Sequence, residues 1–534
     1  MANEIIRSVP DPARTMQGLR DTGYEFNTAV ADLVDNSIAA HATAVDIRLL
    51  ADDRGNIRLS IADNGDGMSR NGLINAMRYG APERSDPASL GKFGLGLKTA
   101  STAYCRCLSV VSRDSGSTPA LMATWDLDHV ANKGEWELLF TDEPDDEALE
   151  HLDAVAAGHS GTVVVWTKVD RLLTHYKNAA GGHARNGLEK RRAALIEHVA
   201  MVYQRFLDPN DQRAPHVTIR VNGTEVRAWD PFQVAHSELL ASENVAVDGT
   251  TAKFSVRAYL LPRPEEFPSE EVAKAAKIAT TRQGIYVYRQ DRLIHDADWL
   301  GMFQIEPHLN LLRVEFSFTY ELDEFFHLDI KKSQIILDDE LWNWLKDQFL
   351  PAPRREANRR YREGEKKEIT KASKGAHDSS NRTIGTKEAE VGGAEVNITD
   401  PNAGMVTVIN PKGKFTLKLP VGPANRPGEV FVQPSSAVTD GMLFEPCIIE
   451  QHKAVRINTE HDYYRKVYVP NLKNGVTIQG MDSLLWALAV AELSATTDKT
   501  AESFADMRFE VSRILRKLVE GLPEPDLDAG TDAA

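Results

Sequence analysis

The sequence predicts an α+β protein of about three domains, and three observations lead to this prediction. The chain has 534 residues, too many for a single hydrophobic core. Segments that alternate like antiparallel strands are interspersed with segments of helical periodicity. A region rich in Arg and Lys, followed by polar and glycine-containing sequence, separates the last part of the chain from the rest. The expected parts are a first domain (1–171), a connector with a helix (172–211), a second α+β domain (212–350), a charged linker (351–395) and a C-terminal α+β domain (396–534).

Composition narrows the class of protein and its compartment. Hydrophobic residues make up 42% of the chain and charged residues 26%, which is ordinary for a globular protein. No apolar run approaches the ~20 residues of a membrane span, and the N-terminus lacks a signal-peptide core. Three cysteines in so long a chain suggest a reducing compartment, so we expect a cytoplasmic protein without a membrane partner. The net charge of −16 argues against a protein that coats nucleic acid, although a local basic patch remains compatible with it.

The first long helix, expected from about Glu25 to Ala40, carries an acid and an amide on one face. Asp32 and Asn36 are four residues apart, so their side chains project in the same direction. A carboxylate beside an amide is what a bound Mg²⁺ ion and a polarised water require. The same spacing is common on solvated helix faces, so the interpretation depends on the segments that follow.

A predicted hairpin, with strands at 45–50 and 57–62, leads into the segment Asp63-Asn-Gly-Asp-Gly-Met68. A carboxylate held at a strand end can accept a hydrogen bond from an exocyclic amine. Gly65 and Gly67 would leave room for a flat ring beside the backbone. A calcium loop is excluded because the acidic residue expected at the end of such a loop is missing.

A glycine-rich segment, Gly91-Lys-Phe-Gly-Leu-Gly-Leu-Lys-Thr-Ala-Ser101, follows a loop and opens a helix. Its backbone amides and the helix N-terminus are suited to phosphates. The segment is neither a P-loop, because the spacing differs, nor a dinucleotide fingerprint, because no strand precedes it. Further strands are expected at 105–112, 119–126, 135–141 and 161–166.

Taken in order, these segments resemble the motifs of the GHKL ATPase superfamily, which includes gyrase B, the heat-shock chaperone, MutL and the MORC proteins. The matching motifs are Asp32-Leu-Val-Asp-Asn-Ser37, Asp63-Asn-Gly-Asp-Gly-Met68, Gly91-Lys-Phe-Gly-Leu-Gly-Leu-Lys98 and Gly161-Thr162. The chain is most similar to MORC-type members through Arg20-Asp-Thr-Gly-Tyr24 and the Phe-Gly-Leu-Gly-Leu-Lys-Thr stretch. The resemblance implies a Bergerat-type α/β sandwich that binds ATP and Mg²⁺.

The resemblance also implies a role for each matching residue. Asn36 would coordinate Mg²⁺, and Asp63 would receive the adenine amino group, with Thr162 nearby through a water molecule. The remaining residues are the adenine-pocket residues Gly65, Gly67 and Met68 and the phosphate-lid residues Gly91, Phe93, Gly94, Gly96, Leu97 and Lys98.

The position of the general base departs from the family pattern. The family usually has Glu there, whereas this chain has Asp32. Aspartate withdraws the carboxylate by roughly 1.5 Å, against a hydrogen-bond reach of about 2.6–3.2 Å. A misplacement of this size can cost on the order of 10²-fold in rate. Either the backbone moves closer, a water intervenes or hydrolysis is slow; we expect a slow ATPase in which Asp32 still polarises the attacking water.

The second domain resembles the family's transducer domain, and Gly284-Ile-Tyr-Val-Tyr-Arg-Gln-Asp-Arg-Leu-Ile294 is again MORC-like. In that domain a loop lysine reaches the γ-phosphate. Within Leu328-Asp-Ile-Lys-Lys-Ser-Gln334 we favour Lys332 over Lys331, although both could instead be solvated loop lysines. An ammonium group there would stabilise charge that develops on the phosphate and would couple nucleotide state to domain angle.

The C-terminal part carries no chemical motif. Residues 351–374 predict an exposed helix with charge pairs, or alternatively a contact with phosphate backbones. Two long helices near the C-terminus suit a dimer contact or partner docking. By resemblance, ATP would close a lid and stabilise an N-terminal homodimer that clamps or remodels a client, with DNA or a protein as candidates. The chain could instead be an ATP-binding switch or scaffold with little hydrolysis, or a chaperone-like ATPase.

Overall fold

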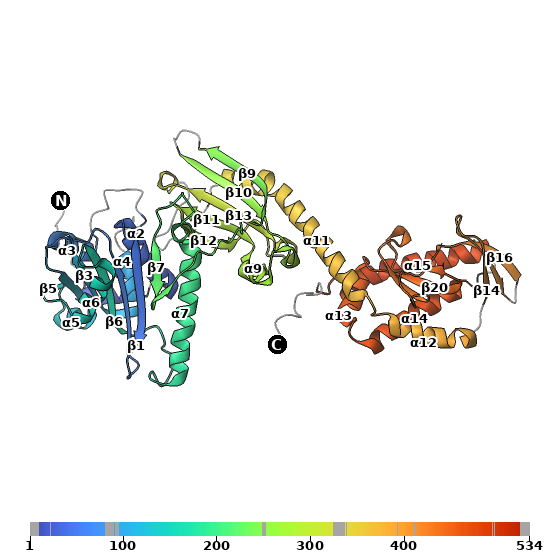
Figure 1. Ribbon diagram of the computed structural model, residues 1–534, viewed down its shortest axis with the longest axis horizontal. Helices are drawn as coiled ribbons and strands as arrows, with labels where there is room; N and C mark the ends of the chain where they lie inside the picture. The colour runs from blue at the N-terminus through green and yellow to red at the C-terminus, as the bar shows by residue number, and fades with distance from the viewer. Residues whose placement is uncertain are drawn as a thin grey trace, which may run out of the picture. The chain divides into compact units, whose positions relative to one another are not determined.

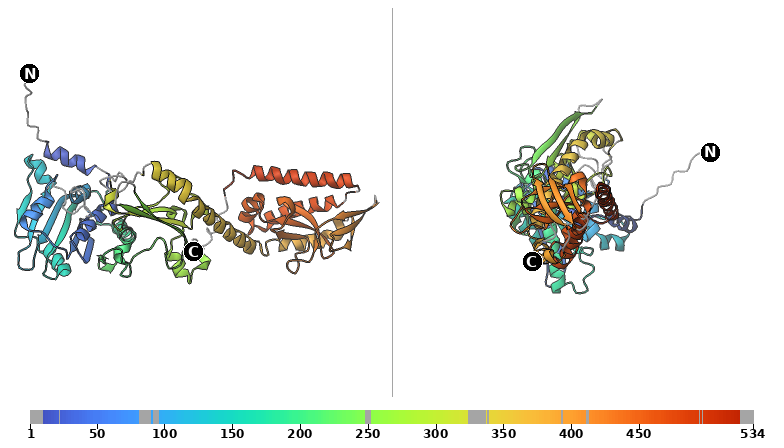
Figure 2. Two further views of the ribbon diagram at one scale, coloured as in Figure 1. Left: turned by 90° about the horizontal axis from the view of Figure 1, so that it is seen from above. Right: turned by 90° about the vertical axis from the view of Figure 1, so that its right-hand side faces the viewer.

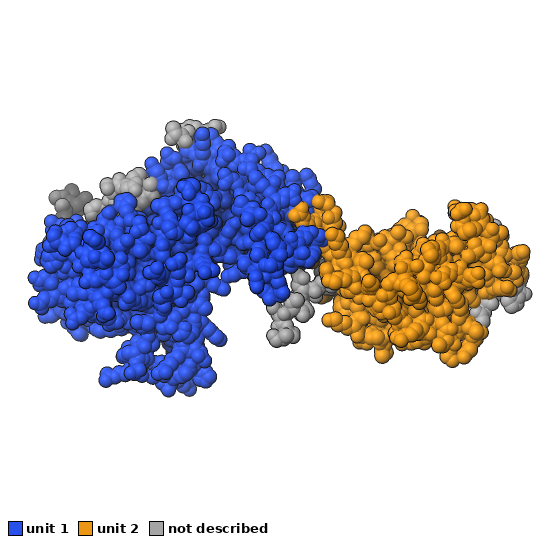
Figure 3. All heavy atoms as spheres, in the orientation of Figure 1, with its two compact units in different colours: residues 1–358 blue, residues 359–534 orange. Residues whose placement is uncertain are grey.

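The computed structural model describes residues 10–21, 23–80, 90, 96–247, 252–323, 337, 339–391, 394–410, 413–493, 495 and 497–523. The chain forms two compact units, residues 1–358 and 359–534 (Figure 3). Helices and mostly antiparallel sheets occur in both units, which confirms the expected α+β class. None of the helices in the described ranges combines the length and the hydropathy needed to cross a bilayer.

The first sheet has eight strands in the order β5-β4-β3-β6-β2-β1-β7-β8. Neighbouring strands are antiparallel, except that β1 and β7 are parallel. The strands are β1 (Ala44–Ala51), β2 (Ile57–Asp63), β3 (Cys105–Arg113), β4 (Leu121–Asp126), β5 (Leu139–Thr141), β6 (Gly161–Val169), β7 (Thr218–Val221) and β8 (Thr224–Glu225).

Helices cover both faces of this sheet, because each central strand presents apolar side chains to both sides. On β6, Trp166 enters the core shared with helices α2 and α4, whereas Val165 enters a second core beneath α6. The expected α/β sandwich is confirmed (Figure 1). The helices of this part are α1 (Pro12–Arg20), α2 (Phe26–Ala39), α3 (Arg70–Met77), α4 (Gly96–Tyr104), α5 (Leu127–Lys133) and α6 (Asp146–Ala156).

The hairpin expected in the second domain joins the first sheet instead. Val45 and Ile47 of β1 pair with Ile219 and Val221 of β7. The preceding helices α7 (Gly182–Val202) and α8 (Gln204–Leu207) bury their apolar side chains in the same core. Because these apolar faces need the first sheet as their partner, that sheet continues to Glu225 and does not end before residue 212.

The second sheet has five strands in the order β12-β11-β13-β10-β9. Its strand β11 faces two cores, because Tyr286 and Tyr288 lie in the core of the first sheet while Ile285 and Val287 lie in that of the second. This strand therefore joins the two sheets within the first unit. The elements are β9 (Glu238–Ala246), β10 (Lys253–Leu260), α9 (Glu270–Ala275), β11 (Gly284–Arg289), β12 (Arg292–Asp298), β13 (Leu312–Phe318) and α10 (Asp339–Trp344).

The region expected as a charged linker, 351–395, is helical. It forms α11 (Pro351–Ser373) and α12 (Asp378–Val391). Ile369 and Ile384 are buried in the core of the second unit, which explains why this mostly polar stretch folds.

The second unit contains two small sheets, of orders β14-β15-β16 and β17-β19-β20-β18. Helices α14 and α15 pack against the second of these sheets (Figure 2). The elements are β14 (Glu395–Asp400), β15 (Met405–Asn410), β16 (Gly413–Lys418), β17 (Val421–Gly422), β18 (Val432–Ser435), β19 (Phe444–Ile449), β20 (His452–Asn458), α13 (Val469–Asn471), α14 (Gly475–Glu492) and α15 (Asp498–Leu518).

Candidate functional site

Asp63 forms one end of the candidate site. It is the last residue of β2, and its side chain is buried between α2 and the sheet. The Ser37 hydroxyl donates to Asp63 Oδ2 at 2.7 Å, and the Gly65 amide donates to Oδ1 at 3.0 Å. Burial raises the pKa of Asp63, although these hydrogen bonds oppose the shift. The carboxylate is therefore held rigidly, with α2 and the following loop as its supports.

Thr162 lies beside Asp63 in the first sheet. The two residues are paired in the register of β2 and β6. The Thr162 hydroxyl is within 2.8 Å of the Ser112 hydroxyl, which also donates to the Gly161 carbonyl at 3.1 Å. Ser112 comes from β3 and was not identified from the sequence, because no local pattern distinguishes it from other strand serines.

Two glycines of the Asp63 segment are required by the protein's own backbone. A Cβ atom on Gly65 would lie 2.5 Å from the Ala40 carbonyl oxygen. Gly67 has a φ of +67°, and a Cβ atom there would lie 1.9 Å from the Arg113 carbonyl oxygen. The structure shows that neighbouring chain segments approach too closely for a side chain at either position. Room for a flat ring beside these glycines stays a prediction. Met68, the last residue of the segment, packs against the first core.

Asp32 and Asn36 form the other end of the candidate site. Both lie on α2, and the Asn36 side-chain amide donates to the Asp32 carbonyl at 2.9 Å. The Tyr24 hydroxyl donates to Asp32 Oδ2 at 3.2 Å. An amide oxygen such as that of Asn36 suits Mg²⁺, which prefers hard oxygen ligands and takes most of the others from water and phosphates.

The N-terminus of α4 approaches Asp32. A Cβ atom built on Gly96 would lie 3.5 Å from Asp32 Oδ2. The first backbone amides of a helix lack intrahelical partners, and the helix dipole makes this end attractive to anions. The carboxylate predicted to act in hydrolysis and a helix N-terminus suited to phosphates therefore lie next to each other.

Two other residues of the predicted lid lie inside the protein. The Lys98 ammonium group is buried and donates to the Ala76 carbonyl, near the end of α3, at 2.9 Å. Leu97 packs against the first core. Gly91, Phe93, Gly94 and both candidate lysines, Lys331 and Lys332, lie outside the described residues, so their roles remain predictions.

The motif that precedes α2 secures Tyr24. The Arg20 guanidinium is buried, donates to the Thr102 carbonyl at 2.8 Å and pairs with Asp170. The Tyr104 hydroxyl donates to the Tyr24 carbonyl at 2.6 Å. These contacts tie the segment to α4 and explain how a residue eight positions before Asp32 brings its phenol to that carboxylate.

Sequence reasoning missed a cation from the second sheet. Arg292, the first residue of β12, lies 257 positions after Asp35 and donates from Nε to Asp35 Oδ1 at 2.9 Å. Its Nη2 atom lies 3.9 Å from Asp32 Oδ1. Burial opposes the charge of Arg292, but the nearby carboxylates of Asp35 and Asp32 outweigh burial and raise its pKa above the ordinary value. The sequence separation explains the omission, because no spacing rule links these positions.

His198 lies close to the same cation. It comes from α7, and together with Arg292 it lines a small cavity of about 150 Å³. Burial, followed by the positive charge of Arg292, lowers the pKa of His198 to about 4, while Asp35 acts in the opposite direction. The imidazole is therefore neutral near pH 7.

Comparisons with known proteins agree with this arrangement. Residues 24–162 match the family model described as "Histidine kinase-, DNA gyrase B-, and HSP90-like ATPase". Over 77 residues the chain is 39% identical to "ATPase MORC2B" of Mus musculus. The matched segment covers 14% of this chain and only 8% of that protein.

A solved structure titled "Crystal Structure of N terminal domain of a DNA repair protein" covers 65% of this chain and 98% of its own, with 15% identity and a TM-score of 0.38. This similarity is too low to support an argument about function. The family match, in contrast, contains Asp32, Asn36, Asp63 and Thr162. The first domain of this chain is thus an ATPase domain of the GHKL superfamily, similar to that of MORC-type proteins.

Proposed function

We propose that this protein binds Mg·ATP between Asp63 and the N-terminus of α4 and hydrolyses it slowly. One observation carries the proposal: a short stretch of α2 contacts Asp63, the proposed adenine-binding carboxylate, at one end and the N-terminus of α4, the proposed phosphate-binding element, at the other. Ser37 contacts Asp63 at 2.7 Å, and Asp32 lies against Gly96. The two α2 positions are five residues apart, about 7.5 Å along the helix axis, with Asn36 between them.

Each side chain then has a defined task. The adenine amine would donate to Asp63, while the Asn36 oxygen would hold Mg²⁺, an ion that neutralises phosphate charge when bound. Asp32 would accept a proton from the attacking water as its oxygen bonds to the γ-phosphorus and the bond to the β–γ bridging oxygen breaks. The backbone amides of the first turn of α4 would stabilise charge on the phosphates.

The short general base fits this proposal. The close approach of Gly96 to Asp32 supports a backbone that moves toward the shorter carboxylate. An intervening water molecule and slow turnover are each compatible with the same geometry.

The wider cycle is part of the proposal. In it, ATP closes the predicted phosphate lid, and Lys332 senses the γ-phosphate. The lid residues are those expected from the resemblance: Gly91, Phe93, Gly94, Gly96, Leu97 and Lys98. Nucleotide binding then stabilises a cytoplasmic homodimer that clamps or remodels a client, and DNA is the client we favour. The resemblance to MORC-type ATPases supports this cycle, and the contacts between Arg20 and α4 would let nucleotide state reach the N-terminal arm.

Steady-state hydrolysis tests the chemistry. We expect Mg²⁺-dependent turnover that falls by about 10²–10⁴-fold in Asp32→Asn, while ATP binding persists. Asn36→Ala should lose this Mg²⁺-dependent turnover. Asp153→Asn is a matched control, since Asp153 is a half-exposed α6 carboxylate paired with Arg113. Unchanged turnover in Asp32→Asn would remove the assignment.

A second candidate, an ATP-binding switch that barely hydrolyses, is favoured by the Asp at position 32. Tight ATP binding without measurable turnover would support it. Light scattering with a non-hydrolysable ATP analogue tests the dimer, and turnover with and without DNA over a salt series tests the client.

A further inference from the structure

The Arg292 side chain extends from the second sheet to Asp32 and Asp35 on α2, at the proposed hydrolytic end of the site. It is the first residue of β12, and its side chain is almost fully buried. Its guanidinium lies 2.9 Å from Asp35 Oδ1 and 3.9 Å from Asp32 Oδ1. One cation therefore stands between two carboxylates of α2, one turn apart.

The contact with Asp35 anchors this cation. Asp35 is completely buried, and its Oδ1 atom also accepts a hydrogen bond from the Tyr203 hydroxyl at 2.7 Å. A buried carboxylate needs such partners, because an uncompensated charge in the interior is costly. The Arg292 guanidinium is consequently held in place by Asp35, and its Nη2 atom faces Asp32.

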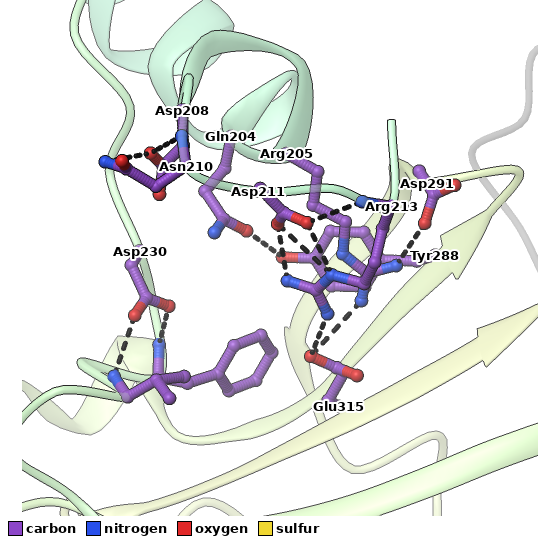
Figure 4. Close-up of polar contacts among 12 residues, drawn as sticks. Gln204, Arg205, Asp208, Asn210, Asp211, Arg213, Asp230, Tyr288, Asp291 and Glu315 are labelled. Carbon is purple, nitrogen blue, oxygen red and sulfur yellow. Dashed lines mark hydrogen bonds and ion pairs between the residues drawn. The ribbon is translucent and has the colours of Figure 1, made fainter. Parts of the chain in front are cut away.

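The turn before Arg292 is strained and is held by specific contacts. Gln290 and Asp291 have φ values of +48° and +66°, in the left-handed region that glycine or asparagine usually occupies. Asp291 accepts a hydrogen bond from Arg205 at 2.8 Å (Figure 4). Strain of this kind persists only where the surroundings over-determine the backbone.

Arg205 links this turn to the middle of the second sheet. Its guanidinium lies 3.8 Å from the centre of the Tyr288 ring and 3.2 Å from the buried Glu315 carboxylate (Figure 4). Asp291 and Arg292 are consecutive, so a single turn is bonded to the second sheet on one side and to α2 on the other. A displacement of the second sheet would therefore carry the Arg292 guanidinium with it.

We propose that Arg292 is a positioning residue for Asp32, through which the placement of the second sheet determines whether the hydrolytic carboxylate is correctly oriented. The proposal rests on the ATPase function proposed above. Tyr24 holds Asp32 Oδ2 from the arm side, and Arg292 faces Oδ1 from the other. An ionised carboxylate offers about four acceptor sites, which leaves room for the attacking water.

The distance of 3.9 Å between Arg292 Nη2 and Asp32 Oδ1 leaves room for this contact to shorten. It is longer than a hydrogen bond, and contacts in catalytic sites without substrate are often long and tighten in the substrate complex. A shift of about 1 Å would turn the ion pair with Asp32 into a hydrogen bond, and misplacement on this scale is worth up to about 10²-fold in rate. Nucleotide-driven movement of the second sheet would thus act on the chemical step.

Three variants test the proposal in the full-length protein. Arg292→Gln removes the cation, Arg292→Lys keeps a charge without the forked geometry, and Arg289→Gln serves as a matched control. Arg289 is a buried arginine of the same hairpin that pairs with Asp323 at 2.6 Å. Each variant is assayed for kcat, for ATP affinity by titration calorimetry and for its melting temperature.

We expect Arg292→Gln to lower kcat by about 10-fold or more, with ATP affinity within about 3-fold of wild type. Arg292→Lys should recover part of the lost rate. Arg289→Gln should lower the melting temperature without a selective loss of kcat. If both Gln variants lose rate and stability in parallel, or if Arg292→Gln turns over like wild type, the proposal is wrong. If Arg292→Gln does not fold, Arg292→Lys decides: a selective loss of kcat supports the proposal, and wild-type kcat overturns it.

The same assay separates this inference from the proposed function. If the wild type hydrolyses ATP and Asp32→Asn abolishes the activity, a normal rate in Arg292→Gln refutes the positioning role alone. If the wild type binds no ATP, or turns it over independently of Asp32, the function proposed above fails and this inference fails with it.

Discussion

The two ends of the proposed nucleotide site, an adenine end and a hydrolytic end, are built in different ways. At the adenine end, Asp63 is held by Ser37, Gly65 and its strand neighbour Thr162, all of which lie within the segment that matches the ATPase family. At the hydrolytic end, Asp32 also faces Arg292 of the second sheet, far beyond that segment. If the proposed function holds, nucleotide binding is a local property of the first domain, whereas hydrolysis depends on how the rest of the first unit is arranged.

The largest effect is expected from a substitution at the proposed adenine end, where Asp63 lies. Asp63→Asn replaces an acceptor-only group by one with an amide donor, so the Ser37 hydroxyl, the Gly65 amide and the adenine amine no longer all find acceptors. We expect ATP affinity to fall by on the order of 10²-fold, together with a lower melting temperature, since loss of such hydrogen bonds costs about 1–3 kcal/mol each. Titration calorimetry measures the affinity.

Asp66→Asn is the control for that experiment, because Asp66 is an exposed neighbour paired with His41. Equal losses of affinity in both variants would show that the loop, and not the Asp63 carboxylate, determines binding.

A substitution of the lysine predicted at the γ-phosphate tests the proposed hydrolytic end of the site. Lys332→Ala should lower kcat by roughly 10-fold or more, because an ammonium group stabilises charge that develops in the transition state. ATP affinity should change less than kcat. Lys331→Ala is the matched comparison, and single-turnover hydrolysis together with nucleotide titration distinguishes the two effects. Equal losses of rate and affinity in Lys332→Ala would argue against the sensing role.

The smallest expected effect concerns pH. The pKa of His198 is about 4 in the folded protein, below its ordinary value of 6.5. Because this pKa is lowered on folding, the unfolded chain binds more protons between pH 6.5 and 4, and stability is lost as pH falls through this window. His198→Gln should remove about 1 kcal/mol of the stability lost between pH 6 and 5.

Urea unfolding at the two pH values measures this difference. His183→Gln alters an exposed histidine at the other end of α7. It should leave the stability lost between pH 6 and 5 unchanged. If His198→Gln loses as much stability between pH 6 and 5 as the wild type, protonation of this histidine does not contribute to the acid sensitivity of the fold.

The parts of the fold and site that depend on local pattern could be predicted from the sequence. Helix α2, strand β2 and the turn after Asp63 follow from periodicity and turn residues. Ser37 lay inside a recognised motif, yet its contact with Asp63 depends on how helix and sheet pack, which no pattern encodes.

The parts that depend on long-range pairing could not be predicted. Strand β7 was expected in the second domain because its hairpin signal is local, but parallel pairing with β1 is decided by tertiary packing. The burial of Lys98 against the Ala76 carbonyl contradicts the usual exposure of lysine. Arg292 was missed for the same reason, since nothing in its neighbourhood points to an acid 257 positions away.

The pairing of β7 with β1 has a practical consequence for dissecting this protein. A fragment cut at residue 171 would contain nearly every recognisable motif but would lack Ile219, Val221 and the apolar face of α7. Its outermost strand would then present open hydrogen-bonding groups and uncovered apolar surface, which favours self-association. Soluble preparations for assay or crystallisation are therefore expected only from fragments that extend past Glu225.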